Sequence, residues 1–482
     1  EFKATLTSGG QALPTLAPVS PDGVVVSDES TFRYAVVSAK QGEFTLTGSS
    51  AVSTLGLHTA LGLPYRGNFR CSDASLTRVW YAGVNTLELC TGGSPSVFLD
   101  GSKRDRWVWT GDLFVEHLVA YVSNADVGAA LNSLARLAEG QEACGYVPHS
   151  APAKDDKRWM PAQTLAEALT FAEYSVWYVI CVHLHYWHTG DQVFVRAFYP
   201  VVQKVMDWLV GLIAGNGLMK VGASNGCTWH VPEFTIGHPT DLNCLMVLAL
   251  ENANALAAAA GEPQVLVWHQ LRRRMAQAIN TYMWNEELGV YMNSDAKDAI
   301  PTQDSNTSAV WSGVAPKERA CRALTWLDEH LSTPWGPLTT EADHPTMTSY
   351  ISPFASFRHL LALSKVNRID CALRMTDALW GRMARTDPED VFWEKVSPTG
   401  AIQPYSQLDC GITFTSRVHG WAAGPTYILS TMVLGVTPSA PGYTKIHVRP
   451  LMADLAWAEG VIPTPYGGGE VQWQRVGDHT CL

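Results

Sequence analysis

The middle of this sequence carries a long succession of segments whose apolar residues recur at three- and four-residue steps. That spacing places the apolar residues on one face of an α-helix, so each segment predicts a helix. Because no strand pattern interrupts the succession, a large helical domain is the strongest constraint on the fold. The eleven segments are 75–90, 113–124, 127–140, 164–187, 193–215, 242–261, 265–284, 318–331, 352–366, 369–384 and 421–434.

Strand patterns flank this helical region on both sides. Apolar and polar residues alternate between Gly, Pro and Ser breaks from residue 3 to about residue 50, and strand-and-turn patterns return after Gly435. Such alternation indicates short antiparallel strands. We therefore expect an N-terminal β region at 1–60, a helical domain at 61–435 and a C-terminal β-strand region at 436–482.

Eleven consecutive helices form either an open solenoid or a closed barrel of helical hairpins. A solenoid shows a fixed sequence repeat of roughly 33 to 47 residues, and none is visible here. The loops differ greatly in length, and several are rich in Trp, His and Asp. Loops of that kind fit a closed barrel whose cleft is built from its connections at one end. The sequence therefore predicts a mainly α fold, an (α/α)6 barrel with β pieces at both ends.

Charge and cysteine content narrow the class of protein. The formal net charge of −11 argues against nucleic acid or an anionic membrane as partner, because either requires a basic patch. The apolar stretches are too short or too often interrupted to predict a membrane span. The ten Cys show no C-x-x-C pair, so we expect no structural zinc site, and we expect no cofactor. No calcium-loop spacing stands out, and whether a structural calcium is bound stays open. Disulfides stay possible, with a connectivity that spacing does not reveal.

Two features favour a secreted, extracellular glycoprotein. The chain begins without Met, and an N-x-S/T sequon stands at Asn306, Thr307 and Ser308 in a segment that we interpret as a polar loop. Both are expected in a mature chain whose signal peptide has been removed. We expect such a chain to act as a monomer.

The segment DGSKRDRWVWTGD at residues 100–112 combines carboxylates, cations and indoles in a chain that is only 16% charged. A charged run is most often a solvated loop. Here the Trp residues are interleaved with the charges. A flat apolar ring flanked by carboxylates is what a sugar requires, since carboxylates accept hydrogen bonds from hydroxyls while indole covers the C–H face.

Three parts of the chain resemble the α-L-rhamnosidases of glycoside hydrolase family 78. They are DGSKRDRWVWTGD at 100–112, FWEKVSPTG at 392–400 with SRVHGWAAGPTYILSTMVLGV at 416–436, and the C-terminal stretch from PGYTKIHVRP to GEVQW at 441–473. The likeness runs from about residue 65 to the end in the same order. It implies a six-hairpin (α/α)6 fold and a rhamnose pocket.

The resemblance also implies roles for individual residues. Asp100, Trp109 and Asp112 fall on positions that hold the rhamnose ring, and Asp105 is counted with them. Glu394 falls on the general base, and His419 on a histidine that contacts the sugar. Each of these residues taken alone is as often a salt-bridge partner or a core residue.

One position departs from the family pattern. The resemblance implies a Glu after the Arg-Asp pair as the general acid, and this chain has Arg106 there. An Arg cannot donate its proton at any workable pH. Three interpretations stay open: another carboxyl such as Asp105 or Glu116 is the acid of a rhamnosidase, the chain is a sugar-binding pseudoenzyme, or the chemistry has changed to one that uses a cation.

The third interpretation has a definite chemical form. If rhamnose caps O4 of a uronate, a base can remove the C5 proton and rhamnose can leave from C4 by β-elimination. That proton becomes acidic only when the uronate carboxylate is neutralised, and Arg106 can supply the cation. In a D-glucuronate the proton and the leaving group lie on one ring face, so one His or Tyr can act as base and then as acid.

Two polar loops supply candidates for these steps. The loop CGYVPHSAPAKDDKRWMPA contains Tyr146, His149, Arg158 and Trp159, and the loop SNGCTWHVPEFTIGHPTD contains Trp229, His230 and His238. A single His in such a loop is more often structural than catalytic. The HLHYWH run at 183–188 lies inside a helical pattern, and we interpret it as packing and a helix end.

The combination of a rhamnosidase-like frame with Arg106 resembles polysaccharide lyase family 27, in its fungal form. Members of that family act on L-rhamnose α-1,4-linked to D-glucuronate at the tips of gum arabic side chains. The resemblance implies a lyase that takes a plant polysaccharide of the arabinogalactan type, releases rhamnose and leaves a 4,5-unsaturated uronate. The residues themselves indicate a departure from ordinary hydrolysis more firmly than they indicate a lyase.

Overall fold

The computed structural model describes residues 2–8, 11–15, 34–39, 66–102, 105–153, 170–226, 228–229, 237–263, 265–341, 349–404, 415–476 and 479–481. The predicted N-terminal β region is present in it as a small antiparallel sheet with the strand order β2-β1-β3. Its strands are β1 (Phe2–Ser8), β2 (Gln11–Thr15) and β3 (Tyr34–Ala39).

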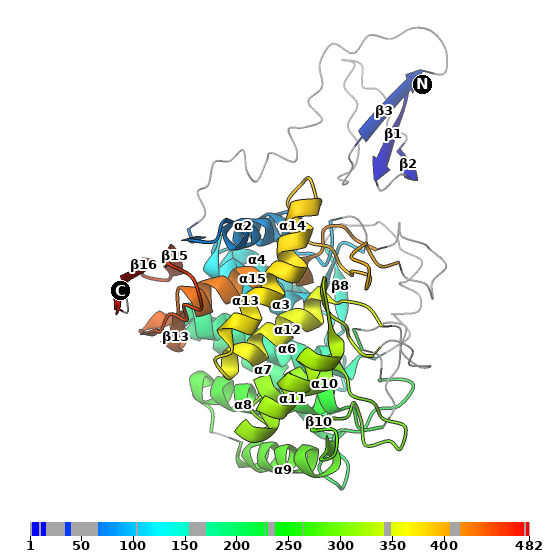
Figure 1. Ribbon diagram of the computed structural model, residues 1–482. Coiled ribbons are helices and arrows are strands. Elements are labelled where there is room, and N and C mark those ends of the chain that lie inside the picture. The colour runs from blue at the N-terminus through cyan, green and yellow to red at the C-terminus, as the bar shows by residue number, and fades with distance from the viewer. Residues whose placement is uncertain are drawn as a thin grey trace.

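Contacts between the helices arrange them in an inner ring and an outer layer, which form the predicted (α/α)6 barrel. Figure 1 shows these helices from the side. Each inner helix contacts the next, and α15 contacts both α12 and α3, so the inner ring closes. The inner helices are α3 (Thr110–Val122), α6 (Ala172–Thr189), α8 (Thr240–Ala260), α10 (Gln303–Trp311), α12 (Pro353–Lys365) and α15 (Pro425–Ile428) with its π-helical continuation η4 (Leu429–Val433). The outer helices are α2 (Ala74–Leu89), α4 (Val127–Ala138), α7 (Gln192–Val210), α9 (Leu266–Tyr282), α11 (Lys317–Leu331) and α13 (Ile369–Thr376) with η1 (Asp377–Gly381) and α14 (Arg382–Thr386).

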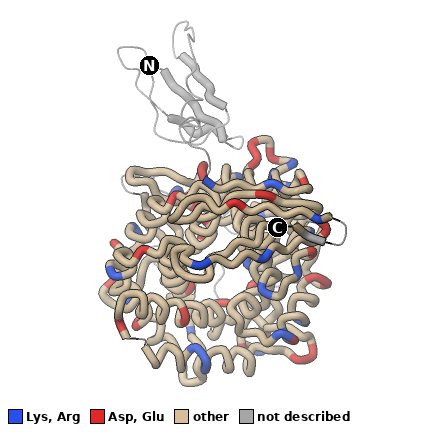
Figure 2. The backbone as a smooth tube through the Cα atoms, turned by 90° about the vertical axis from the view of Figure 1, so that its left-hand side faces the viewer, with Lys and Arg blue, Asp and Glu red and all other residues tan. Residues whose placement is uncertain are grey.

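Burial explains why the two layers differ in sequence. Every residue of α3 is buried, whereas α7 buries only one face of its nineteen residues. A helix surrounded by other helices is apolar all round, and a helix at the surface is amphipathic. Helix α8 is long and apolar enough to cross a membrane by composition, but 67% of that stretch is buried inside the barrel. Lys and Arg are interspersed with Asp and Glu along the chain in Figure 2.

All eleven predicted helical segments contain helices, and among the described residues the structure adds α10, which the apolar period did not predict. Its sequence QDSNTSAVW is polar, yet its first eight residues are buried. The prediction that Asn306 lies in a polar loop is therefore wrong. Asn306 is fully buried, and its side chain donates to the carbonyls of Tyr291 and Thr302 and accepts from the Tyr291 amide. A glycan cannot be attached to a side chain enclosed in this way.

The HLHYWH run belongs to α6, and its buried histidines pack inside the protein as predicted. His185 Nδ1 lies 3.0 Å from the Tyr121 hydroxyl, and the ring of His188 stacks on Tyr121. Burial lowers the pKa of His188 to about 4. The helix ends at Gly190, which adopts a left-handed conformation with φ of 69°.

The C-terminal strands form a four-stranded sheet with the order β17-β16-β15-β4. Strand β4 (Asn68–Cys71) comes from the segment before the first helix and pairs with β15 (Trp457–Thr464). The sheet is completed by β16 (Gly467–Val476) and β17 (His479–Cys481), and it follows a hairpin of β13 (Val436–Ala440), η5 (Pro441–Tyr443) and β14 (Lys445–Val448). Trp473 joins this sheet to the barrel, because its indole is fully buried and donates to the Val433 carbonyl.

Short strand pairs connect several of the helices. They are β5 (Thr91–Gly92) with β6 (Val97–Phe98), β7 (Trp107–Trp109) with β8 (Ser150–Pro152), β9 (Trp284–Asn285) with β10 (Val290–Tyr291), and β11 (Ser332–Thr333) with β12 (Gly336–Pro337). Isolated bridges tie together the segments that precede the inner helices, among them Gly101 with His419 and Ile351 with Val396. These segments therefore meet at the end of the barrel where the inner helices begin.

The eight cysteines in the described ranges are all free thiols, and Cys227 and Cys410 lie outside those ranges. Burial raises the pKa of the Cys90 and Cys181 thiols well above their ordinary value. These two thiols therefore act as small apolar side chains of the core.

Candidate active site

Four inner helices carry a carboxyl in their first turn. These residues are Asp112 in α3, Glu173 in α6, Asp241 in α8 and Asp304 in α10. The amide dipoles of a helix favour negative charge at its N-terminus. Because the inner helices begin at the same end of the barrel, their carboxyls gather there.

The first group of polar side chains is centred on His419. Its Nε2 lies 3.0 Å from Oδ1 of Asp112, and its Nδ1 lies 3.9 Å from Oε2 of Glu394. All three residues are at most 2% exposed. Glu394 Oε2 also accepts a 2.7 Å hydrogen bond from the Ser416 amide, which fixes the direction of its carboxylate. One imidazole thus separates two buried carboxyls, which the sequence places far apart.

Burial controls the electrostatics of this group. It raises the pKa of Asp112, with His419 acting in the opposite direction and the charge of Glu394 adding to the rise. The pKa of Glu116, one turn further along α3, is raised well above the ordinary value by burial and by Asp112 and Asp100. Glu116 packs directly on Gly420, where an added Cβ would lie 1.9 Å from its Oε1. Its carboxyl therefore lies behind the segment that carries His419.

The 100–112 segment lies against this group. Oδ1 of Asp100 accepts from the Trp107 amide at 3.0 Å, and the Asp100 carbonyl accepts from the Gly420 amide at 2.7 Å. Asp105 and Arg106 both have positive φ, at 51° and 54°. Residues other than Gly rarely adopt such a conformation, and it occurs disproportionately at functional sites.

Arg106 is turned inward from this strained turn. Its side chain is buried, and its Nη1 donates to the Ser102 carbonyl at 3.0 Å. It is close enough to the Cys90 thiol to oppose the rise in that thiol's pKa. Lys103 and Arg104 lie outside the described residues.

Trp109 directly precedes helix α3, which carries Asp112, and it packs against other aromatic rings. Its ring centre lies 5.1 Å from that of His149 and 5.9 Å from that of Tyr174. The hydroxyl of Tyr146 lies 3.2 Å from His149 Nδ1 and accepts from the amides of His149 and Phe171. Burial lowers the pKa of His149 to about 4, so this imidazole is neutral at physiological pH.

A second group of aromatic rings contacts His419 itself. The ring of Trp421 is 4.4 Å from His419, and its Nε1 donates to the Glu394 carbonyl. Trp229 meets Trp421 edge to face, with 6.0 Å between ring centres. Trp229 is thereby connected to the group around His419 through Trp421.

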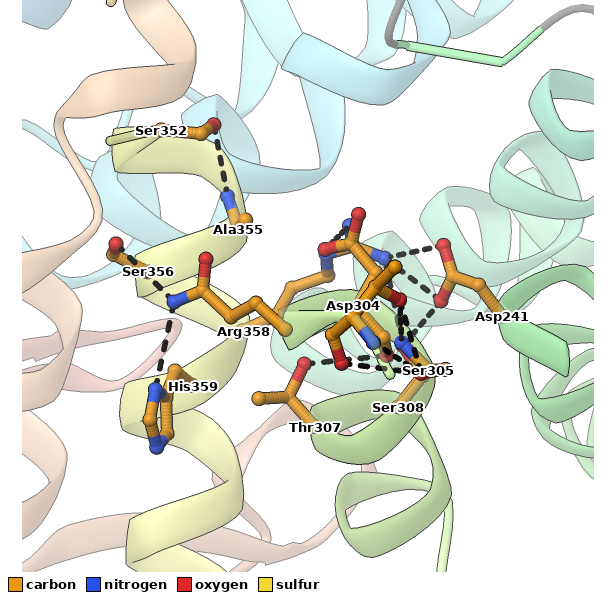
Figure 3. A network of polar contacts seen from close by, with 12 residues as sticks. Asp241, Asp304, Ser305, Thr307, Ser308, Ser352, Ala355, Ser356, Arg358 and His359 are labelled. Carbon is orange, nitrogen blue, oxygen red and sulfur yellow. Dashed lines mark hydrogen bonds and ion pairs between the residues drawn. The ribbon is translucent and has the colours of Figure 1, made fainter. Parts of the chain in front are cut away.

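Beneath these rings, Arg358 connects the first turns of two inner helices. It is fully buried, contacts both carboxylate oxygens of Asp241 at 2.9 and 3.0 Å, and lies 2.5 Å from Asp304 Oδ1 (Figure 3). Its guanidinium also lies 5.7 Å from the ring centre of Trp229. Burial raises the pKa of neighbouring Glu173 to about 8, and the charge of Asp241 adds to the rise.

The structure therefore brings together most of the sequence-predicted site residues that it describes. Asp100, Asp105, Arg106, Asp112, Glu394 and His419 surround one region, with Trp109, His149, Tyr146 and Trp229 on its walls. Arg158, Trp159 and His230 lie outside the described residues. His238 pairs with Asp295, with 2.7 Å between Nδ1 and Oδ2. The sequence did not predict the network that consists of Glu173, Asp241, Asp304 and Arg358. An acidic residue beside the start of a predicted helix was the pattern that could have indicated it.

A closed barrel of helical hairpins with carboxyls, imidazole and indoles at one end defines the class of six-hairpin glycosidase folds. The family model for the bacterial alpha-L-rhamnosidase six-hairpin glycosidase domain matches residues 64–333, and the chain belongs to this family. The model for the bacterial alpha-L-rhamnosidase C-terminal domain matches residues 435–482.

Solved structures with similar folds agree with this family. The rhamnosidase of glycoside hydrolase family 78 from Bacillus sp. GL1 has a TM-score of 0.70 and 25% identity, over 86% of this chain and 41% of that one. An alpha-L-rhamnosidase of Streptomyces avermitilis, complexed with L-rhamnose, has a TM-score of 0.67 and 17% identity, over 99% of this chain and 44% of that one. This chain thus spans less than half the length of either enzyme.

A curated relative has a different activity. The N,N'-diacetylchitobiose phosphorylase of Vibrio proteolyticus is 25% identical over 286 residues, which are 50% of this chain and 32% of that protein. This chain therefore spans about a third of that relative.

Proposed function

We propose that this protein cleaves the bond to a terminal L-rhamnose of a glycan. The observation that carries the proposal is the buried group of Asp112, His419 and Glu394 at the open end of a barrel of the rhamnosidase family. Vicinal sugar hydroxyls donate to carboxylates such as these. Trp109 covers the apolar face of the sugar, and its Nε1 has no acceptor among the described residues, so it is available to a hydroxyl.

We further propose that the bond joins rhamnose to O4 of a D-glucuronate and breaks by β-elimination. A base removes the C5 proton, the C4–O4 bond breaks, and rhamnose leaves with O4 after protonation, so the uronate gains a 4,5 double bond. Arg106 supports this proposal as a buried cation within the rhamnose-side segment. His149 supports it because a neutral imidazole bonded to Tyr146 can take up and return a proton.

The substrate and setting follow from that chemistry. Rhamnose linked to glucuronate at chain ends suits a plant polysaccharide of the arabinogalactan type, and such a polymer is met outside cells. We therefore infer a secreted enzyme that acts as a monomer. The frame of buried carboxyls serves the rhamnose end, and Arg106 with the loop around Tyr146 serves the uronate end.

The second candidate function is inverting hydrolysis by an α-L-rhamnosidase. One observation favours it: burial raises the pKa of Glu116 well above its ordinary value, which favours the protonated form that a general acid needs. The Glu116 carboxyl packs against Gly420, which counts against direct contact between this carboxyl and the leaving glycosidic oxygen. Asp105 is the other candidate acid, because its half-buried side chain lies in the turn before Arg106.

The products distinguish these functions. The protein is incubated with a rhamnosyl-α-1,4-glucuronate oligosaccharide while free rhamnose and the ultraviolet absorbance of an unsaturated uronate are followed together. Equal growth of both signals is the expected result. Release of rhamnose without the absorbance establishes the hydrolase, provided that Asp105→Asn or Glu116→Gln abolishes the release. Binding of the oligosaccharide without any release establishes a sugar-binding pseudoenzyme.

A further inference from the structure

A cavity of about 500 Å3 lies on the side of the barrel, and none of its lining residues belongs to the candidate active site. It lies where α14 and η1 contact the outer helix α2, which Figure 1 shows beside α14. Ligand sites commonly have volumes in this range. Its polar lining is formed by Asp73, Arg374, Asp377, Arg382, Arg385 and Asp454, with the indole of Trp335 beside them.

The Arg382 guanidinium stacks on an indole, and its charge acts on the nearby carboxyl of Asp377. Its guanidinium carbon lies 4.5 Å from the ring centre of Trp335, and it makes no hydrogen bond or ion pair within the described ranges. The same indole is in close contact with Gly400, where an added Cβ would lie 2.2 Å from the ring. A stacked guanidinium is ordered before a ligand arrives, so fewer rotamers are lost when it binds a carboxylate.

The other two arginines of the cavity differ in their contacts. Arg385 is used internally, because it contacts both Asp377 oxygens, the nearer at 2.7 Å, and also donates to Ser75. Arg374 has only the weak acceptor Cys371 Sγ at 3.2 Å among the described residues. Arg374 and Arg382 thus face one cavity with no hydrogen bond to a carboxylate among the described residues, and the charge of Arg382 contributes to lowering the pKa of Asp377.

The helix that bears these arginines is irregular at the cavity. Residues Asp377–Gly381 form a π-helical turn between α13 and α14. Such turns are less stable than a regular α-helix and occur frequently at functional sites. The irregular turn lies between Arg374 and Arg382, so it sets how the two cations are presented.

We propose that this cavity is a second glycan-binding site, which holds a uronate residue of an acidic polysaccharide through Arg374 and Arg382. Guanidinium groups bind carboxylates by paired, charge-assisted hydrogen bonds. The choice of uronate rests on the proposed function, whose substrate carries D-glucuronate. The binding itself does not depend on whether the terminal bond is eliminated or hydrolysed.

The position of the cavity suits a polysaccharide chain whose terminal sugar lies in the active site. Trp335 contacts Gly400, which follows Glu394 in one loop, and α14 leads into that loop from the other side. A second cavity of about 190 Å3 shares Arg374 and Ala378 with the first, so the site extends along the helix beyond one sugar. Binding there raises the local concentration of chain ends, as linked sites do.

The direct test is a calorimetric titration of the full chain with D-glucuronate and with D-glucose at low salt. The Arg106→Gln variant serves as the background, because it removes the cation that the proposed function places at the uronate end of the active site. We expect glucuronate to bind and glucose to bind much more weakly, with Arg382→Gln lowering the glucuronate affinity about tenfold or more. Arg272→Gln is the matched control, because Arg272 is a half-exposed arginine of α9 that pairs with Glu251.

Three outcomes overturn the inference: unchanged glucuronate affinity in Arg382→Gln, equal binding of glucuronate and glucose, or equal binding of inorganic phosphate. A kinetic comparison gives a second readout in the otherwise wild-type enzyme. Arg382→Gln should raise KM for the polymer and leave KM for a rhamnosyl-glucuronate disaccharide unchanged. If neither substrate is cleaved by wild type while glucuronate still binds through Arg382, the proposed function fails and this site stands.

Discussion

The Nε2 atom of His419 lies 3.0 Å from Oδ1 of Asp112. His419 precedes the inner helix α15, whereas Asp112 lies in the first turn of the inner helix α3, so the two residues are far apart in the sequence. Only the closed ring of helices brings them together. Both side chains are buried, so the pair is held in a fixed direction. We interpret it as the anchor for rhamnose hydroxyls, with Glu394 on the other side of the imidazole.

Replacement of Asp112 tests that anchor. Asp112→Ala should weaken L-rhamnose binding by about 1 to 3 kcal/mol, because hydroxyls and His419 lose their partner. The measurement is a calorimetric titration with rhamnose. Asp126→Ala is the control: Asp126 caps α4 by accepting from the Ala129 amide, so its loss should cost about 1 kcal/mol of stability and leave rhamnose affinity intact. Equal rhamnose affinity in the two variants contradicts the assignment.

Glu173 should give the protein a characteristic pH dependence of stability. Its pKa of about 8 in the folded state lies above the ordinary 4.5, so the folded protein keeps a proton that the unfolded chain releases. This contribution is fully present below about pH 4.5 and is lost as the pH rises towards 8, by a few kcal/mol at most.

The free energy of unfolding of wild type minus that of Glu173→Gln should therefore fall across that pH range in urea titrations. Glu286→Gln is the control, because Glu286 is exposed and its pKa is lowered by its hydrogen bond with Arg322. Its difference from wild type should stay flat from about pH 5 to 8. A flat difference for Glu173→Gln as well would show that Glu173 ionises normally in the fold.

Asn306 should behave as a buried structural residue. Asn306→Ala leaves the Tyr291 amide and the carbonyls of Tyr291 and Thr302 without their side-chain partner, so unfolding should become easier by about 1 to 3 kcal/mol or more. Chain expressed through a glycosylating secretory route should carry no sugar at this position in peptide mass spectra. A glycan found there, or unchanged stability, would be incompatible with the buried helix α10.

Arg106 should matter most for charged substrates. Arg106→Glu places a negative charge near the substrate carboxylate and should cut turnover by orders of magnitude, since one oxyanion donor is worth about 3 to 4 kcal/mol. Arg106→Gln removes the cation with less disturbance of a buried position. A uronate methyl ester should lose much less activity in both variants. Equal losses on charged and neutral substrates would show that Arg106 has a structural role only.

Periodicity in the sequence predicted the helices because packing between two layers requires an apolar face on each. It failed at α10, where buried polar side chains such as Asn306 are satisfied by hydrogen bonds that no apolar pattern reveals. The closure of the ring also escapes periodicity, since it depends on contacts between α15 and α3.

The candidate site was predictable where it lay in short motifs and not where it depended on the barrel. The segment with Asp100 and Asp112 was recognisable from its mixture of charge and indole. Arg358 was not, because it stands within an ordinary helical pattern and its partners Asp241 and Asp304 come from two other helices. Only the inner ring places these two helix starts next to one guanidinium.

The most direct measurement of the central claim identifies which bond to rhamnose breaks. A rhamnosyl-glucuronate substrate is cleaved in water enriched in heavy oxygen, and the released rhamnose is weighed by mass spectrometry before its anomeric oxygen exchanges with water. Elimination breaks the C4–O4 bond of the uronate, so the account predicts rhamnose without the label and an unsaturated uronate. Rhamnose that carries heavy oxygen at C1, beside a saturated uronate, would contradict the lyase and establish an α-L-rhamnosidase.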